Sequence, residues 1–121
     1  MIHETPSLEI QEIQEISDKK CIKAALTGRL LSRVDMRPLD KFFQDSRKNG
    51  VINFIFDLSD VSFICSTGLS KFAQYLKEVK EEGGKIIVYG TPKEVKHIIQ
   101  LVNLHDRLNS CETFEDALKK L

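Results

Sequence analysis

The stretch Val51–Leu69, VINFIFDLSDVSFICSTGL, decides the fold of this chain. In its first half, Phe54 and Phe56 occupy one side of an alternating pattern, and Ile55 places an apolar side chain on the other side. An apolar run with this pattern is typical of a strand that is covered on both faces of a sheet. We therefore predict a central strand that ends at Asp57.

The second half of the same stretch predicts a turn and then a helix. A polar turn at residues 59–60 leads to Ser66 and Thr67, where we expect a helix to begin. The helix should run to Glu82, before the glycine pair at 83–84 ends it. Its apolar positions recur with the helical period at Leu69, Phe72, Ala73, Leu76 and Val79. A serine in the first turn can cap free backbone N–H groups, or it can be a site where charge is added.

The residues before the first helix predict a hairpin at the edge of the sheet. Residues 8–16 partly alternate isoleucine with glutamate and glutamine, as in a half-solvated edge strand. After a turn at residues 17–20, residues 21–27 return as a second strand, antiparallel to the first. Residues 28–34 are expected to form a loop.

The remaining segments predict three helices and one strand. We expect a helix from residue 35 or 36 to residue 48, a strand over residues 85–89, a helix from Thr91-Pro92 to Asn103, and a last helix from Thr113 to Leu121. Thr91 and Thr113 each have an acidic residue three positions later, which is the pattern of a capping box. The third helix should face inward with Val95, Ile98, Ile99 and Val102. Whether residues 104–111 include a brief edge strand stays open.

Strands that alternate with helices imply parallel crossovers, so the sequence predicts an α/β domain. The expected architecture is a mostly parallel sheet with an antiparallel N-terminal edge hairpin, flanked by about four helices. The predicted core includes Ile52, Phe54, Ile55, Phe56, Leu69, Phe72 and Leu76. In open α/β sheets, functional sites lie beyond the carboxyl ends of the parallel strands, and Ser66 falls at that end.

The bulk composition limits the kinds of partner. The 121 residues suit one domain with a core of its own. Lysine plus arginine and aspartate plus glutamate both number 18, so the net positive charge that nucleic-acid binders and peripheral membrane proteins use is missing. We therefore expect a protein partner, no nucleic acid and no membrane insertion. Self-association stays open.

The cysteines argue against a disulfide framework and a zinc site. Cys21, Cys65 and Cys111 are odd in number, lie far apart and form no C-x-x-C pair. The N-terminal segment has no basic region followed by an apolar core, and no apolar run approaches about 18 residues. These features predict a cytoplasmic protein that holds no metal and no cofactor.

Four segments together resemble the STAS family, the bacterial anti-sigma-factor antagonists and their relatives. They are the motif DLSDVSFICSTGL at residues 57–69, LTGRL at 26–30, EGGKIIVYG at 82–90 and VNLHDRL at 102–108. The resemblance covers nearly the whole chain. It implies a single STAS-like domain over residues 1–121 that acts as a regulatory protein-binding module in transcription signalling.

The resemblance also implies a phosphorylation switch. In the family, the serine or threonine at the matching helix start is phosphorylated by a partner that is both an anti-sigma factor and a serine kinase, and the unphosphorylated form binds that partner. Carried over by position, the acceptor is Ser66, with Thr67 as the second choice. The partner-binding residues implied in the same way are Cys65, Ser66, Thr67, Gly68, Leu69, Ser70, Arg29 and Leu31.

Three positions depart from the family pattern. Many members carry an acidic residue directly before the acceptor, where this chain has Cys65. The usual acidic positions in the loop after the second strand are Arg29 and Leu31 here. These departures keep a second interpretation open, in which the domain has no phosphorylation switch and serves as a scaffold subunit of a larger signalling or transport assembly.

An enzyme is the remaining alternative, with Cys65 or Ser66 as a nucleophile at the strand-to-helix turn. Ile64 stands where G-x-S-x-G requires a glycine, and no local motif links any histidine to the turn. The histidines are His3, His97 and His105. We therefore predict no catalytic residue, and we interpret Cys65 as a small buried packing residue.

Overall fold

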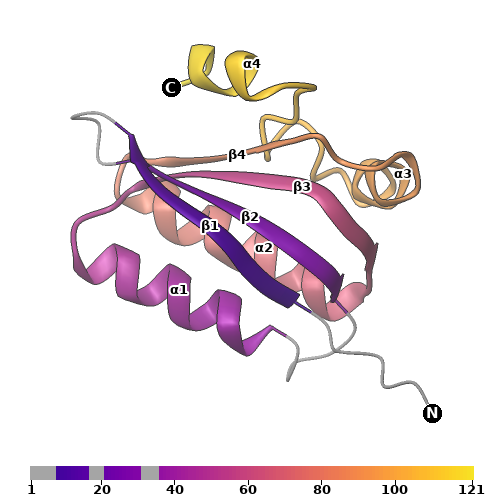
Figure 1. The fold of residues 1–121 in the computed structure, drawn as a ribbon, viewed down its shortest axis with the longest axis horizontal. Helices are drawn as coiled ribbons and strands as arrows, with labels where there is room; N and C mark the ends of the chain where they lie inside the picture. The colour runs from indigo at the N-terminus through magenta and orange to yellow at the C-terminus, as the bar shows by residue number, and fades with distance from the viewer. Residues whose placement is uncertain (1–7, 17–20, 31–35) are drawn as a thin grey trace.

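The computed structural model describes residues 8–16, 21–30 and 36–121 (Figure 1). The strands are β1 (Leu8–Ile16), β2 (Cys21–Leu30), β3 (Asn53–Ile64) and β4 (Lys85–Tyr89). The helices are α1 (Arg37–Lys48), α2 (Ser66–Glu81), α3 (Lys93–Leu101) and α4 (Phe114–Lys119). The element types and their order match those predicted from the sequence.

The described strands form one sheet with the order β1-β2-β3-β4. β1 pairs antiparallel with β2, and both β2 with β3 and β3 with β4 pair in parallel. Parallel neighbours need a crossover connection, and α1 and α2 supply the two that this sheet requires. The predicted α/β class with a mostly parallel sheet is confirmed. The predicted turn at residues 17–20 lies outside the described residues.

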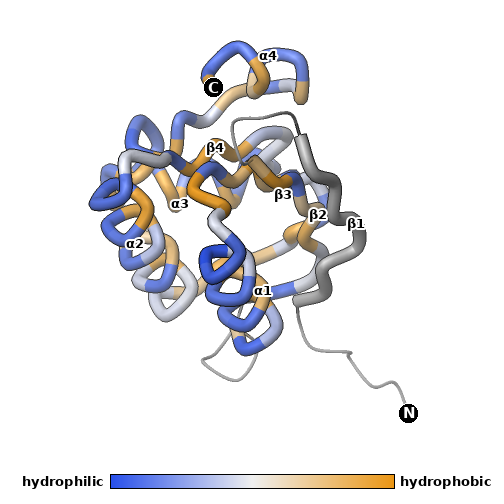
Figure 2. Tube along the Cα trace, turned by 90° about the vertical axis from the view of Figure 1, so that its left-hand side faces the viewer, coloured by the Kyte–Doolittle hydropathy of each residue, from blue (hydrophilic) through white to orange (hydrophobic). Residues whose placement is uncertain are grey.

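The helices divide between the two faces of the sheet. α1 and α2 lie side by side on one face, and α4 lies on the other (Figures 1 and 2). Hydrophilic and hydrophobic segments alternate along α1 and α2 in Figure 2, as expected for amphipathic helices. The core beneath α1 and α2 contains most of the buried side chains, while the face under α4 holds a smaller cluster of Cys21, Ile55, Ile87, Tyr89 and Ala117.

β3 contributes to both clusters, as its pattern predicted. Phe54 and Phe56 pack into the larger cluster and Ile55 into the smaller one, and all three side chains are fully buried. The aromatic rings of α1, α2 and β3 contact one another, with Phe43 and Phe54 centroids 4.8 Å apart. Phe72 is buried as expected. A strand covered on both faces thus forms the centre of the domain.

Two of the predicted core residues are only half-buried. Ile52 lies before the first residue of β3, and Leu69 lies in the first turn of α2, beyond the end of the sheet. Leu69 packs against the larger core cluster at its margin. Leu76, two helical turns further into α2, is buried.

The strands at the centre of the sheet are longer than predicted. β3 does not end at Asp57 but continues to Ile64, so the predicted turn at residues 59–60 is wrong. β2 likewise runs to Leu30 through the first part of the predicted loop. The two strands stay paired past this point, with Arg29 opposite Phe63, and their register shifts twice, between Ala25 and Thr27 and between Gly28 and Arg29, with the extra residues in β3. Backbone pairing therefore extends both strands through a polar sequence.

The two predicted capping boxes behave differently. Thr113 caps α4, because its hydroxyl oxygen accepts a hydrogen bond from the Asp116 backbone N–H at 3.1 Å. Thr91 does not cap α3; the N-cap residue is Pro92, and the Thr91 hydroxyl is buried with no hydrogen-bond partner among the described residues. α4 ends at Lys119, two residues before the predicted end.

The C-terminal end of α3 is more exposed than predicted. Val95 and Ile99 are buried and Ile98 packs at the margin of the core, but the Val102 residue is 46% exposed. Val102 is the C-cap of α3, where the chain turns toward Asn103 in the left-handed region at φ 61°. Beyond it, the open question about residues 104–111 resolves to a single parallel bridge between Tyr89 and Cys111.

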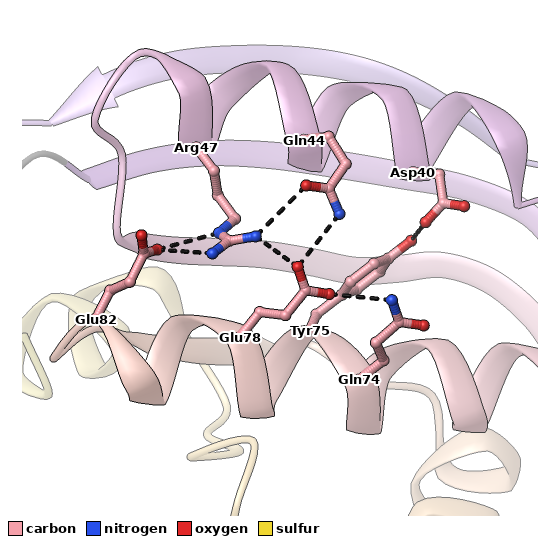
Figure 3. A network of polar contacts seen from close by, with 7 residues as sticks. All are labelled: Asp40, Gln44, Arg47, Gln74, Tyr75, Glu78 and Glu82. Carbon is pink, nitrogen blue, oxygen red and sulfur yellow. Dashed lines mark hydrogen bonds and ion pairs between the residues drawn. The ribbon is translucent and has the colours of Figure 1, made fainter.

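A row of polar contacts joins α1 to α2 at their solvent-facing margin (Figure 3). The Arg47 guanidinium of α1 binds the carboxylates of Glu78 and Glu82 on α2. Further along, the Tyr75 hydroxyl donates to Asp40, whose other oxygen accepts from Lys71 at 2.9 Å. Burial, with the hydrogen bond and charge of Asp40, raises the pKa of Tyr75 well above its usual value. These contacts fix the position of α2 along α1.

Candidate functional site

The start of α2 lies at the carboxyl end of the central strand. β3 ends at Ile64, Cys65 is extended at φ −99° and ψ 178°, and Ser66 is the first helical residue. The Leu69 N–H donates to the Cys65 carbonyl at 3.0 Å, which closes the first turn of the helix. Ser66 is exposed. The chain therefore presents this serine to solvent at the end of a rigid strand.

The free N–H groups of this turn have no side-chain cap within the described part of the chain. The N-cap residue is Cys65, and its thiol makes no capping hydrogen bond. Ser66 stands one position too late to be the N-cap, so the alternative in which Ser66 serves as that cap is wrong. The first turn also contains no acidic residue. No acidic side chain of the first turn therefore offsets the positive end of the helix dipole beside the exposed hydroxyl.

Cys65 is not the buried packing residue that we predicted. It is half-buried at the mouth of the turn, because the backbone changes there from strand to helix and leaves one side open. Thiols are poor hydrogen-bond acceptors, which explains why Cys65 does not replace an acidic N-cap. An aspartate at this position would satisfy an N–H group that Cys65 leaves uncapped.

The other predicted partner-binding residues of α2 gather around Ser66. Gly68 is buried, Thr67 and Leu69 are half-buried, and Ser70 is exposed. Two hollows flank the start of the helix. One is lined by Thr67, Ser70, Lys71 and Gln74. The other, which we call the Ser66 groove, is lined by Ser66, Leu69, Ser70, Ala73, Val102, Leu104 and Arg107 and has a volume of about 280 Å³.

The structure describes only one of the two partner-binding residues that we predicted in the loop after the second strand. Arg29 lies in β2, half-buried, opposite Phe63 and therefore at the same end of the sheet as Ser66. Leu31 lies outside the described residues. Phe63 itself is 42% exposed, an apolar side chain that our sequence reasoning did not include. We did not predict Phe63 as a surface residue because we expected β3 to end at Asp57.

Sequence reasoning also missed the far wall of the Ser66 groove. Val102, Leu104 and Arg107 follow α3, about forty residues after Ser66 in the chain, and join the site only through the fold. They fall within the segment at residues 102–108, which supported the family resemblance but in which we predicted no site residue. The apolar pattern of α3 predicted that Val102 lies in the core, so we did not expect it to line a surface groove.

The described residues provide little for catalysis or metal binding. His97 is exposed on α3, and His105 lies in the turn after it with its Nδ1 atom 3.5 Å from the Asp106 carboxylate; His3 lies outside the described residues. No set of three or more histidine, cysteine, aspartate or glutamate residues in the described ranges could hold a metal ion. None of the helices described is both long and apolar enough to cross a membrane.

The sequence profile of the STAS domain matches residues 11–117. The chain belongs to the STAS family. The match spans the sheet and the helices described above, including the start of α2, so the resemblance carried by the four segments is confirmed.

Solved structures of STAS proteins share this fold. The Thermotoga maritima protein TM1081 superposes with a TM-score of 0.80 at 19% identity, over 90% of this chain and 92% of that one. The anti-sigma factor antagonist SpoIIAA of Bacillus is similar in its unphosphorylated form, with a TM-score of 0.74, 16% identity and coverage of 94% and 95%. Its phosphorylated form gives 0.68 at 16% identity, over 94% of this chain and 98% of that one. At these identities the likeness establishes the fold.

Proposed function

We propose that this STAS domain is a regulatory binding module that acts as an anti-sigma factor antagonist. In this proposal, a partner protein that is an anti-sigma factor and serine kinase docks around Ser66 and the first turns of α2. Phosphorylation of Ser66 then releases the partner. The proposal assigns no catalytic chemistry to the domain itself, and it places the module in the cytoplasm, where such a partner acts.

The observation that carries the proposal is the exposed Ser66 hydroxyl at the uncapped start of α2. A kinase must reach the hydroxyl, and Ser66 is exposed. The fold must also accept the product, and a phosphate at a helix N-terminus gains from the free N–H groups and from the positive end of the dipole. SpoIIAA, which has the same fold, is known in a phosphorylated and an unphosphorylated form. We therefore expect modification to change the surface and to leave the domain folded.

The switch follows from charge. A phosphate adds roughly −1.5 to −2 charges and three strong acceptor oxygens to a helix turn that contains no acidic residue. A partner that buries the first turn of α2 would have to desolvate that charge or place a like charge against it, and both raise the free energy of the complex. The residues expected to contact the partner with Ser66 are Cys65, Thr67, Gly68, Leu69, Ser70, Arg29 and Leu31.

A specific observation supports a second candidate, a STAS scaffold subunit without a switch. Cys65 and Arg29 stand where many family members carry acidic residues, and the structure places both at the Ser66 end of the sheet. Without those carboxylates, a family kinase lacks part of what it contacts beside the hydroxyl. In this second function, the same surface docks a larger assembly permanently.

The experiment that separates the two functions is phosphosite mapping of the protein recovered from its native cell, combined with intact mass. The switch predicts a phosphate on Ser66, and the scaffold predicts none under any growth condition. A phosphate on Thr67 or Ser70 would preserve the switch and contradict our choice of residue.

Variants extend this test to the partner. Ser66→Ala should keep partner binding and abolish phosphate incorporation, whereas Ser66→Asp should weaken binding. Cys65→Asp should increase the rate at which a family kinase labels Ser66, and Cys65→Ser is the control that restores a cap without a charge. Complex formation that is indifferent to Ser66→Asp, with no labelling of any variant, would favour the scaffold.

A further inference from the structure

The Ser66 groove brings one cationic side chain opposite the proposed phosphorylation site. Its walls are the first turns of α2, with Ser66, and the segment after α3, with Arg107. The apolar side chains of Leu69, Ala73, Val102 and Leu104 also line the groove. The groove has a volume of about 280 Å³, and Ser66 and Arg107 both line it.

Among the described cationic residues toward this end of the domain, Lys71, Arg29 and Arg107 differ in their existing contacts. Lys71 of α2 is already paired with Asp40 of α1 at 2.9 Å. Arg29 of β2 is half-buried against the end of the sheet, opposite Phe63. Arg107 is exposed, and its guanidinium makes no ion pair within the described ranges. Arg107 can therefore move toward Ser66 without breaking an ion pair of the kind that holds Lys71.

The acidic groups near Arg107 are weaker competitors than a phosphate. Arg107 also lines the neighbouring hollow along α2, where Glu81 and Asp106 lie. Each carboxylate carries one charge and two oxygens, whereas a phosphoserine carries nearly two charges and three acceptor oxygens. A guanidinium binds such an oxyanion through two parallel hydrogen bonds, a geometry that Lys71 cannot reproduce. A phosphate on Ser66 should therefore draw Arg107 to its own side of the groove.

We propose that Arg107 is the intramolecular partner of a phosphate on Ser66, and that their ion pair closes the Ser66 groove. The inference rests on the proposed function, because it assumes that Ser66 is the acceptor. The ion pair adds a second effect to that of the phosphate charge. It links α2 to the segment after α3 and covers Leu69 and Val102, so an apolar side chain of the partner can no longer bind in the groove. Phosphorylation would then block docking by charge and by shape together.

The test uses the whole chain with phosphoserine installed at position 66 during synthesis by amber suppression, so no kinase is required. The second ionisation of the phosphate is followed by ³¹P NMR as the pH is raised. A nearby guanidinium favours the dianion, so the phosphate pKa in the unaltered chain should lie about 0.3 to 0.7 units below that in Arg107→Gln. The difference should disappear in about 1 M NaCl, where the Debye length is about 3 Å.

Matched variants separate Arg107 from the other charged groups around Ser66. Lys119→Gln removes an exposed cation on α4, across the sheet, and should leave the phosphate pKa unchanged. Arg29→Gln and Lys71→Gln each remove one competing cation, and His105→Gln removes the histidine closest in sequence to Arg107. Each should shift the phosphate pKa less than Arg107→Gln does. Arg107→Lys should keep only part of the effect.

Methyl NMR provides the structural readout of groove closure. The Val102 and Leu104 methyl resonances should shift on phosphorylation in the unaltered chain and shift less in Arg107→Gln. Equal phosphate titrations in the unaltered chain and Arg107→Gln would overturn the inference, as would a pKa difference that belongs to Arg29 alone. Failure of a kinase to label Ser66 would instead overturn the proposed function, because the phosphate here is introduced without one.

Discussion

The two ends of α2 differ in how the fold holds them. The C-terminal half is tied to α1 by Arg47, which binds Glu78 and Glu82, and the helix ends in backbone hydrogen bonds at Glu82 and Gly83. The N-terminal end has an extended cysteine as its N-cap, no acidic residue in its first turn and an exposed serine as its first residue. The helix is therefore anchored at one end and open to a ligand or a modification at the other.

This contrast explains how one helix can serve both stability and signalling. The buried side chains of the helix begin at Phe72, beyond its first turn, and continue through Leu76 and Val79, whereas Leu69 in the first turn packs only at the margin of the core. A change at Ser66 alters charge and hydrogen bonding at a surface and removes no core contact. The predictions below test the division between an anchored and an open end, from the largest expected effect to the smallest.

The strongest test of the anchored core is Phe54→Ala or Phe56→Ala. Both rings are fully buried and contact the aromatic rings of α1 and α2, so each truncation should lower the free energy of unfolding by about 3 to 5 kcal/mol. Chemical denaturation measures the change. Phe63→Ala, on the exposed extension of the same strand, is the control and should cost far less. Unchanged midpoints in both core variants would contradict the assignment of the central strand.

Arg47→Ala tests the anchored end of α2 directly. The substitution leaves Glu78 and Glu82 close together without their cation, and we expect a loss of about 1 kcal/mol because the group is partly exposed. The control is Lys41→Ala, which breaks an exposed pair with Asp45 within α1 and should change stability by less than about 0.5 kcal/mol. Thermal unfolding of the two variants in parallel gives the comparison. A larger effect for Lys41 would show that the pairing of α1 with α2 does not hold the helix.

The smallest effect is expected at the open end. Thr113→Ala removes the hydroxyl that caps α4 and should cost about 1 kcal/mol, whereas Ser66→Ala removes a hydroxyl that is not the N-cap of its helix and should cost less than about 0.5 kcal/mol. Both are exposed hydroxyl residues at helix starts, so each serves as the other's control. A cost at Ser66 as large as that at Thr113 would mean that the serine stabilises the start of α2, and the open end would be less open than the geometry indicates.

Some features of this protein were determined by the sequence alone. The apolar pattern around Ile55 specified a strand that is buried on both faces, because alternate side chains must lie on opposite sides of a sheet. The order of strands and helices specified parallel crossovers, and Thr113 with Asp116 specified a helix start, because that cap is made between residues three apart. The motif that ends at Leu69 also pointed to the family and to Ser66.

Only the tertiary structure decided the remainder. β2 and β3 continue past their apolar runs because each offers the other's backbone a hydrogen-bonding partner, which no single-strand pattern reveals. Thr91 has the same local motif as Thr113, yet its hydroxyl is buried without capping α3, whose N-cap is Pro92. Arg107 stands across a groove from Ser66 because the fold returns a distant segment to the start of α2. Local patterns record contacts between near neighbours in the chain, and the Ser66 groove is made of contacts between distant ones.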